Sequence, residues 1–148
     1  MQDRIEKSVD LNAPVARVWR AITDYREFGH WFRVSLENPF VLGEITRGRI
    51  TYPGFEHLPF QAKVEAMEPE RLFAFTWPQY DVEAGVDYAH EPWTLVEFRL
   101  TPAGNGTRLA IIESGFSALP EGPRATFMRM NERGWTEQLT NIRDHVEA

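Results

Sequence analysis

The sequence contains no cysteine, and its 148 residues include only 16 Lys and Arg against 22 Asp and Glu. Without cysteine the chain can form no disulfide bond, thiol nucleophile or cysteine zinc site, which is compatible with a reducing cytoplasm. The net charge of -6 disfavours nucleic acid and anionic membranes, because both are recognised mainly by clustered Lys and Arg. We therefore expect neither as a partner.

The sequence also lacks the motifs of targeting and of several catalytic classes. Met1 to Val9 alternates charged and apolar residues, unlike a signal peptide or membrane span, so we expect a cytoplasmic protein with no membrane insertion. No Gly-x-Ser-x-Gly elbow occurs, and Gly43 to Gly48 lacks the Lys of a phosphate-binding loop. No metal or cofactor is expected, because the spacing of the four histidines does not favour ligation: His30, His57, His90 and His145.

The composition is that of a folded protein rich in aromatic rings. Hydrophobic residues make up 43% and charged residues 26%, and the length fits one domain over residues 1–148. Aromatic residues reach 13%, with 5 Trp and 10 Phe. This ring surface indicates either a dense aromatic core or a pocket, and the composition leaves both open.

The first third of the chain predicts one strand and two helices. Apolar residues alternate from Ile5 to Leu11, as in a half-buried strand. Asn12 is expected to cap a helix whose apolar face repeats at i, i+3, i+4 and i+7 through Val15, Val18, Trp19 and Ile22. Thr23-Asp24 either ends this helix or starts a second short helix through Phe28, and Gly29 then interrupts the helical pattern.

The middle of the chain predicts antiparallel hairpins. Turn residues separate short strands from Leu36 to Trp77, and Pro69-Glu70 forms a tight turn. In the last of these strands, Phe73, Phe75 and Trp77 share one face. Positions 78–92 have no clear period, and we interpret them as a mobile or ligand-gating loop.

The last third predicts a hairpin and a long helix. Strands Trp93–Leu100 and Thr107–Glu113 are joined through Gly104-Asn105-Gly106. The period of two places one set of residues on the core side: Val96, Phe98, Leu100, Leu109, Ile111 and Glu113. The final helix is expected from about Pro123 to the end, with an apolar stripe at spacings of 7, 4, 3 and 4: Met128, Trp135, Leu139, Ile142 and Val146.

This order of elements is an α+β plan, with a sheet of six or seven antiparallel strands and one long helix. A single helix cannot fill the concave side of such a sheet, because the sheet twists away from it. The remaining volume is either filled by rings or left as a pocket.

Several segments, in this order, resemble the SRPBCC superfamily, and specifically its bacterial branch similar to the C-terminal domain of the activators of the Hsp90 ATPase. They are Leu11-Asn12-Ala13-Pro14 with Val18-Trp19, Thr23-Asp24 before Trp31-Phe32, Met67 to Leu72 with Trp77, Gly106-Thr107, Glu113 to Phe116, and Asn131 with Gly134-Trp135. The resemblance implies a helix-grip (START-like, Bet v 1-like) fold. It also implies a cavity between the final helix and the sheet.

Two polar residues are expected near that cavity. Asn131 follows Met128 by three residues and precedes Trp135 by four, so it lies on the same helical face. Glu113 either pairs with a protein donor or an Arg, lines a wet pocket or contacts a ligand. The full set of candidate cavity residues is Trp31, Phe32, Phe75, Trp77, Phe98, Glu113, Met128, Asn131 and Trp135.

Three functions remain open from the sequence. The first is binding of a small hydrophobic molecule, with Asn131 and Glu113 orienting its polar end. The second is an enzyme that uses the same cavity with Glu113 as base, which we disfavour because no His or Tyr partner is evident; no catalytic residue is assigned. The third, implied only by the resemblance, is contact with a chaperone.

Overall fold

A seven-stranded antiparallel sheet forms the body of the protein, as the α+β plan predicts. The computed structural model describes residues 3–81 and 85–148. The strand order is β1-β9-β8-β5-β4-β3-β2, so the first strand and the last hairpin lie together at one edge. The strands are β1 (Arg4–Leu11), β2 (Val34–Leu36), β3 (Ile45–Ile50), β4 (Pro59–Glu68), β5 (Leu72–Trp77), β8 (Thr94–Ala103) and β9 (Gly106–Ser114).

Two tight turns set the register of the central strands. Gly104 adopts a φ of 60° in the turn between β8 and β9, and Phe98 then pairs with Ile111. Glu70 adopts a φ of 61° in the predicted turn between β4 and β5, where Arg71 forms an ion pair with Glu68. The predicted core face of the hairpin is confirmed, since Val96, Phe98, Leu100, Leu109, Ile111 and Glu113 are all buried.

Two short helices follow β1, and their ends differ from the sequence prediction. Helix α1 (Val15–Thr23) begins after Pro14, whose extended backbone occupies the cap position, so the predicted Asn12 cap is wrong. Helix α2 (Tyr25–Phe32) is capped by Asp24, whose carboxylate accepts from the backbone of Arg26 and Glu27.

Gly29 does not interrupt α2 but lies inside it. A Cβ atom at this position would approach the carbonyl oxygen of Val34 to 2.4 Å, so only glycine lets β2 start so close to the helix.

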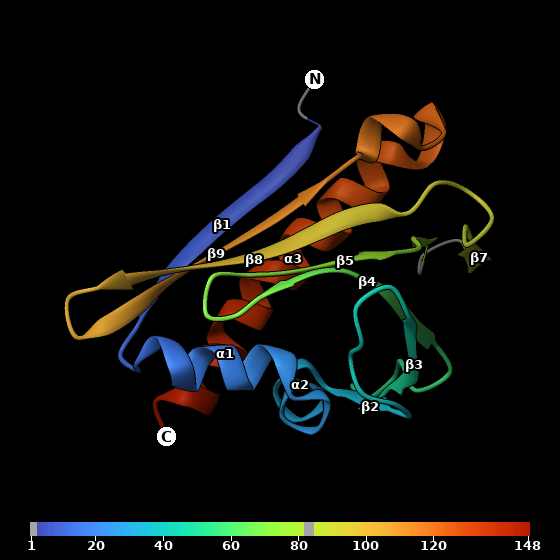
Figure 1. Cartoon of the computed structure of the whole chain (residues 1–148). Helices are drawn as coiled ribbons and strands as arrows, with labels where there is room; N and C mark the ends of the chain where they lie inside the picture. The colour runs from blue at the N-terminus through green and yellow to red at the C-terminus, as the bar shows by residue number, and fades with distance from the viewer. Residues whose placement is uncertain (1–2, 82–84) are drawn as a thin grey trace.

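The long helix α3 (Glu121–Val146) crosses the sheet and ends beside α1, as Figure 1 shows. It begins two residues before the predicted start and is preceded by a 3₁₀ turn, η1 (Phe116–Ala118). The segment 78–92, interpreted as a gating loop, contains two paired short strands, β6 (Tyr80–Asp81) and β7 (Val86–Asp87). Its residues 82–84 lie outside the described part of the chain.

Aromatic rings fill much of the space between the sheet and the helices. Phe28 of α2 contacts Phe32, Phe40 and Phe98 at centroid distances of 4.7, 5.2 and 6.5 Å. Phe73 and Phe98 stack at 6.0 Å across β5 and β8. These phenylalanines pack α2 against the sheet as a dense core.

Candidate ligand-binding cleft

Three neighbouring strands bring polar side chains together at one end of the sheet. Trp77, the last residue of β5, pairs with Thr94, the first residue of β8. Glu113, near the end of β9, pairs with Val96, two residues further along β8. Since residues two apart share a face, Thr94 and Glu113 lie diagonally on the inner face, where their side chains can meet.

Helix α3 covers this point with two residues one turn apart, Asn131 and Trp135. The Glu113 carboxylate accepts hydrogen bonds from Asn131 Nδ2 at 3.0 Å and from Trp135 Nε1 at 2.9 Å. From the sheet it accepts bonds from Thr94 Oγ1 at 2.7 Å and Trp77 Nε1 at 2.8 Å, and Gln79 Nε2 lies at 3.3 Å. Five side chains therefore donate to one carboxylate.

The Glu113 carboxylate is completely buried, and among the described residues its hydrogen-bond partners are all neutral. Burial raises the pKa of Glu113 above its usual value, and the bonds from Thr94, Trp77, Trp135 and Asn131 oppose that rise by stabilising the charged form. The partners are directional dipoles without a countercharge, so they hold the carboxylate at a fixed point. This network ties β5, β8, β9 and α3 together.

Two adjoining hollows lie beside this network, and we call them together the cleft. The first has a volume of about 250 Å³ and the second about 460 Å³. Both are lined by Phe32, Ile50, Leu58, Trp77, Met130 and Asn131. The first is completed by Pro59, Phe60, Gln61, Pro78, Gln79, Tyr80 and Asp87, and the second by Tyr52, Phe55, Arg133, Gly134, Trp135, Glu137 and Gln138.

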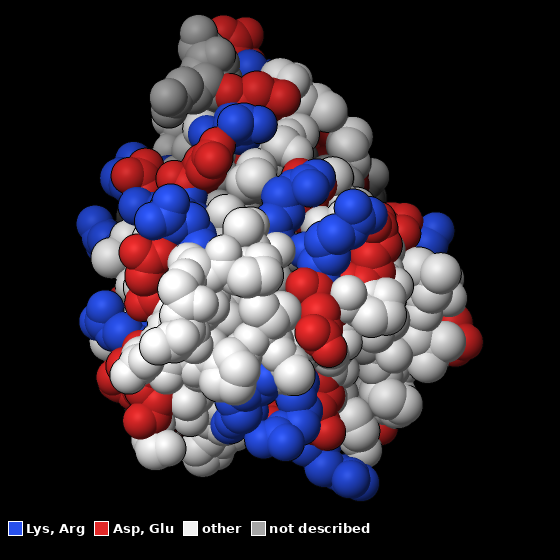
Figure 2. Space-filling model, turned by 60° about the vertical axis from the view of Figure 1, so that its left-hand side comes forward, with Lys and Arg blue, Asp and Glu red and all other residues white. Residues whose placement is uncertain are grey.

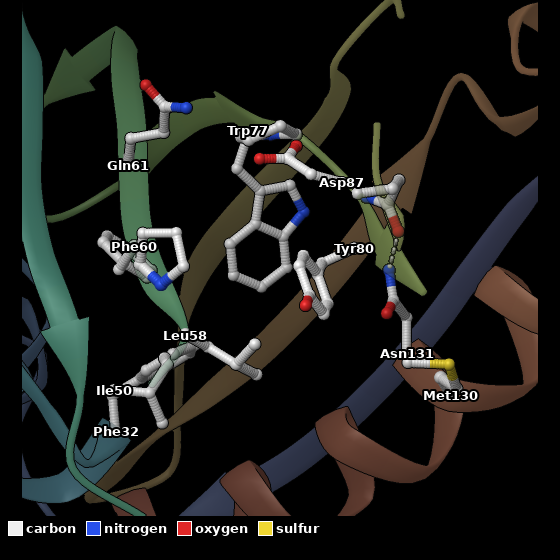
Figure 3. A pocket seen from close by; sticks show the side chains of 13 residues that line it. Phe32, Ile50, Leu58, Phe60, Gln61, Trp77, Tyr80, Asp87, Met130 and Asn131 are labelled. Carbon is white, nitrogen blue, oxygen red and sulfur yellow. Dashed lines mark hydrogen bonds between the residues drawn. The ribbon is translucent and has the colours of Figure 1, made fainter. Parts of the chain in front are cut away.

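Figure 3 shows how the first hollow is arranged. The indole of Trp77 stands between Phe60 and Leu58 on one side and Tyr80 on the other. Asn131 enters from α3 and donates from Nδ2 to Gln79 Oε1 at 2.9 Å. The walls are thus mostly apolar with a few polar atoms, as in small-molecule sites of ~300–1,000 Å³.

The structure distributes the nine candidate cavity residues over several surroundings. Phe32, Trp77, Asn131 and Trp135 line the cleft. Glu113 lines neither hollow and lies behind Asn131 and the two indoles. The other candidates lie in the core or at a third hollow. Phe75 and Phe98 are fully buried, and Met128 packs against the core. Trp31 is buried with its Nε1 donating to Ala21 O, and it borders a third hollow beside His30 and His145.

Sequence reasoning missed Thr94 and Gln79, which complete the carboxylate network. Thr94 was accessible to the period-two argument, because it precedes Val96 by two residues on the same face of the strand. Gln79 follows Pro78 after the end of β5 and carries no periodic signal. The sequence carries no signal for the cleft residues Ile50, Leu58 and Met130 either. Whether they line a cleft depends on the gap that remains between the strands and the helix.

A second carboxylate, Glu27, links the three helices near the C-terminal end of α3. It accepts from Arg17 and Arg20 of α1 at 2.7 and 2.8 Å, and His145 of α3 lies at 2.8 Å. Burial acts to raise the pKa of Glu27, but the bonds from His145, Arg17 and Arg20 outweigh it and lower the pKa to about 2. We refer to these four residues as the helix ion cluster.

The described residues give no sign of a metal site or of a membrane-spanning helix. Among the described residues, no group of three or more His, Asp and Glu side chains could hold a metal ion. No helix within residues 3–81 and 85–148 is long and apolar enough to cross a membrane. On the face shown in Figure 2, Lys and Arg side chains are interspersed with Asp and Glu around an uncharged area.

Residues 12–147 match the family described as activator of Hsp90 ATPase homolog 1-like protein. Since the match covers nearly the whole chain, the protein belongs to this family, as the sequence segments predicted. No protein of curated function matches the chain.

Solved structures share the fold. DynU16, described as a putative protein in the dynemicin biosynthetic locus, is 26% identical with a TM-score of 0.76 over 100% of this chain. The chain spans only 48% of DynU16. A protein from Arthrobacter aurescens is 22% identical, with a TM-score of 0.80 over 98% of this chain and 86% of its own. The Aha1 dimer from Colwellia psychrerythraea is 17% identical, with a TM-score of 0.73 over 99% of this chain and 97% of its own.

Proposed function

We propose that this protein binds a small hydrophobic or amphipathic molecule in the cleft between α3 and the sheet. The observation that carries the proposal is the pair of adjoining hollows walled by Phe32, Ile50, Leu58 and Trp77. An apolar guest of matching size would remove this surface from water, which stabilises a complex by about 25 cal/mol per Å² of apolar area before ordering costs.

The contact residues in this proposal are Phe32, Trp77, Asn131 and Trp135, supplemented by Met130. Glu113 acts through them, because its hydrogen bonds hold the indoles and the amide in place. Pre-organised walls lower the entropy cost of binding. From the predicted set, Phe75, Phe98 and Met128 would support these walls from the core, and Trp31 would lie outside the cleft.

An enzymatic use of Glu113 as a base is less well supported. A general base must come within hydrogen-bond reach of the proton that it removes. Glu113 is enclosed by five donors and does not line the cleft, so a substrate there would meet Asn131 or an indole first. Turnover that disappears in Glu113→Gln while the variant stays folded would favour the enzyme.

Contact with a chaperone is a second candidate, favoured by family membership alone. It concerns the outer surface and is compatible with an occupied cleft. A pull-down with purified Hsp90 tests this candidate. If no complex is recovered under conditions that retain a known activator, chaperone contact is excluded.

The binding proposal is tested by blocking the cleft. Met130 is partly buried and lines both hollows, so Met130→Trp places an indole in the space that a guest needs. Leu42→Trp is the matched control, since Leu42 is 60% exposed and lines neither hollow. Binding of the neutral probe 2-naphthylmethanol is followed by saturation-transfer NMR.

We expect Met130→Trp to weaken binding of the probe at least about tenfold, because overpacking a filled site costs ~1–3 kcal/mol. Leu42→Trp should bind like the parent protein. The proposal fails if the parent shows no saturable binding, or if Met130→Trp binds the probe as tightly as Leu42→Trp does.

A further inference from the structure

The buried carboxylate of Glu113 determines which atoms the cleft can offer to a guest. The N–H groups of Trp77 and Trp135 both point to Glu113, at 2.8 and 2.9 Å. An indole has only this one donor. With it engaged behind the wall, each ring presents only carbon and π surface to the cleft, and the two rings stack at a centroid distance of 5.5 Å.

Asn131 is oriented by the same carboxylate. Its Nδ2 donates to both oxygens of Glu113 at 3.0 Å and to Gln79 Oε1 at 2.9 Å. The reverse orientation would place the amide oxygen against three acceptor oxygens, which is repulsive. Oδ1 is therefore the atom left for the hollow, on the side where Trp77 and Tyr80 lie in Figure 3, and it can only accept.

The charged residue at the first hollow also favours a guest that donates hydrogen bonds. Among the described residues lining the first hollow, Asp87 alone is charged, and it is exposed, with Oδ1 accepting from Ala89 N at 2.7 Å. Its second carboxylate oxygen remains for a guest. In the second hollow Arg133 and Glu137 bring opposite charges, both on exposed side chains of α3.

Neutral donors also occur at the first hollow, in the Tyr80 hydroxyl and the Gln61 amide. Gln61 lies at the edge, and its Oε1 accepts from Arg47 at 3.0 Å. A hydroxyl or carbonyl on a guest can use these groups. A carboxylate guest, by contrast, would meet Asp87, with Arg133 as the cation available to it in the neighbouring hollow.

Resting on the proposed function, we propose that the natural guest is an apolar, ring-bearing molecule that carries a protonated amine. The ammonium group lies beside the Asp87 carboxylate and the rings of Trp77 and Tyr80, and the apolar body occupies the space beside Phe32, Ile50 and Leu58. Asn131 Oδ1 adds a further acceptor on the α3 side of the same hollow. A cation is attracted by a carboxylate, an amide oxygen and aromatic faces alike, so this wall suits it better than any other head group.

The test uses three probes that share one ring system and differ in the head group: 2-naphthylmethylamine, 2-naphthylmethanol and 2-naphthoate. Affinities are measured by saturation-transfer NMR at pH 7. We expect the amine to bind about tenfold more tightly than the carboxylate, because Asp87 attracts one and repels the other. The alcohol should lie between them.

Asp87→Asn keeps the oxygen that accepts from Ala89 and removes the charge, so folding should be preserved. It should weaken binding of the amine about threefold to fivefold, which is the effect of one exposed charge pair. The affinity for the alcohol should not change. The matched control is Asp10→Asn. Asp10 lies on β1, at the edge of the sheet opposite β2, and pairs with Arg108. This variant should bind all three probes like the parent.

Each other result overturns the inference in a recognisable way. If 2-naphthoate binds most tightly, the head group lies at Arg133 and the ammonium site is wrong. Binding of a small molecule in the cleft would still hold. Equal affinity of amine and alcohol, or an Asp87→Asn variant with unchanged amine binding, would remove the ammonium site. Failure of all three probes to bind saturably would count against the proposed function itself.

Discussion

Two carboxylates that contact α3, one at its middle and one near its C-terminal end, are held in opposite ways. Glu113 lies fully buried among five neutral donors, and its pKa is raised by burial. Glu27 is partly buried in the helix ion cluster, where Arg17, Arg20 and His145 lower its pKa to about 2. The same chemical group is thus made less acidic at the middle of α3 and more acidic near its C-terminal end.

The difference indicates a different role for each carboxylate. Opposite charges stabilise the ionised Glu27 and link α1, α2 and α3, as a structural tie would. Neutral donors around Glu113 give less charge compensation but a defined geometry, because each donor has a fixed direction. We infer that the helix ion cluster around Glu27 stabilises the fold. The hydrogen-bond network around Glu113 positions the walls of the cleft.

The largest effect is expected from Glu113→Gln. A glutamine amide would turn an NH₂ group toward an indole N–H, leaving at least one buried donor without an acceptor. We expect a loss of about 3 kcal/mol in the free energy of unfolding, since a buried donor left without an acceptor costs ~1–3 kcal/mol. Urea unfolding at pH 7 measures this loss.

The control for Glu113→Gln is Glu65→Gln. Glu65 is exposed on β4 and accepts from Thr76 Oγ1 at 2.7 Å, a bond that the glutamine oxygen can keep. This variant should change stability by no more than about 0.5 kcal/mol. A Glu113→Gln protein as stable as Glu65→Gln would mean that the neutral donors contribute nothing particular.

A smaller effect is expected from Glu27→Gln. The amide keeps one acceptor but loses the charge that both arginines share, and solvent screens part of that interaction. We expect a loss of about 1 kcal/mol at pH 7. The comparison partner is Asp10→Asn, which removes an exposed ion pair with Arg108 and should leave the unfolding midpoint unchanged. If the two variants lost the same free energy of unfolding, the helix ion cluster would be no more stabilising than an ordinary surface ion pair.

The smallest effect is the opposite pH dependence of the two sites. The folded pKa of Glu27 lies below 4.5, so its contribution is complete above pH 4.5 and is lost as pH falls toward 2. The folded pKa of Glu113 lies above 4.5, so its contribution is greatest below pH 4.5 and declines as pH rises through the folded pKa. Neither slope can exceed about 1.4 kcal/mol per pH unit.

Denaturant titrations between pH 3 and pH 8 resolve this difference. The stability gap between the parent and Glu27→Gln should close toward acid pH. The gap between the parent and Glu113→Gln should narrow toward neutral pH. Slopes of the same sign would show that one of the two environments is misassigned.

Much of the fold was predictable because it follows from local periodicity. The alternation from Val96 to Leu100 and from Leu109 to Glu113 fixed the inner face of a hairpin, and the paired register confirms it. Helix ends were less predictable. Asn12 has the chemistry of a cap, yet Pro14 delays the helix, and Gly29 stays inside α2 because β2 approaches it too closely for a side chain.

The candidate site was predictable only in part. Asn131 and Trp135 were recognised from their helical spacing, and Glu113 from its place on the inner face of a strand. Phe75 and Phe98 carry the same signal of inward-facing rings as Trp77 but lie entirely in the core. Whether an inward ring borders empty space depends on the distance to the opposing element, which no single segment encodes.

The sequence by itself determined the strands, the long helix and the inward position of Glu113, because periods of 2 and 3.6 residues are properties of the backbone. The tertiary structure alone decided that the carboxylate meets Trp77, Gln79, Thr94, Asn131 and Trp135. It also decided that the cleft lies beside this network, since partners 18 to 36 residues away in the chain meet only when sheet and helix pack.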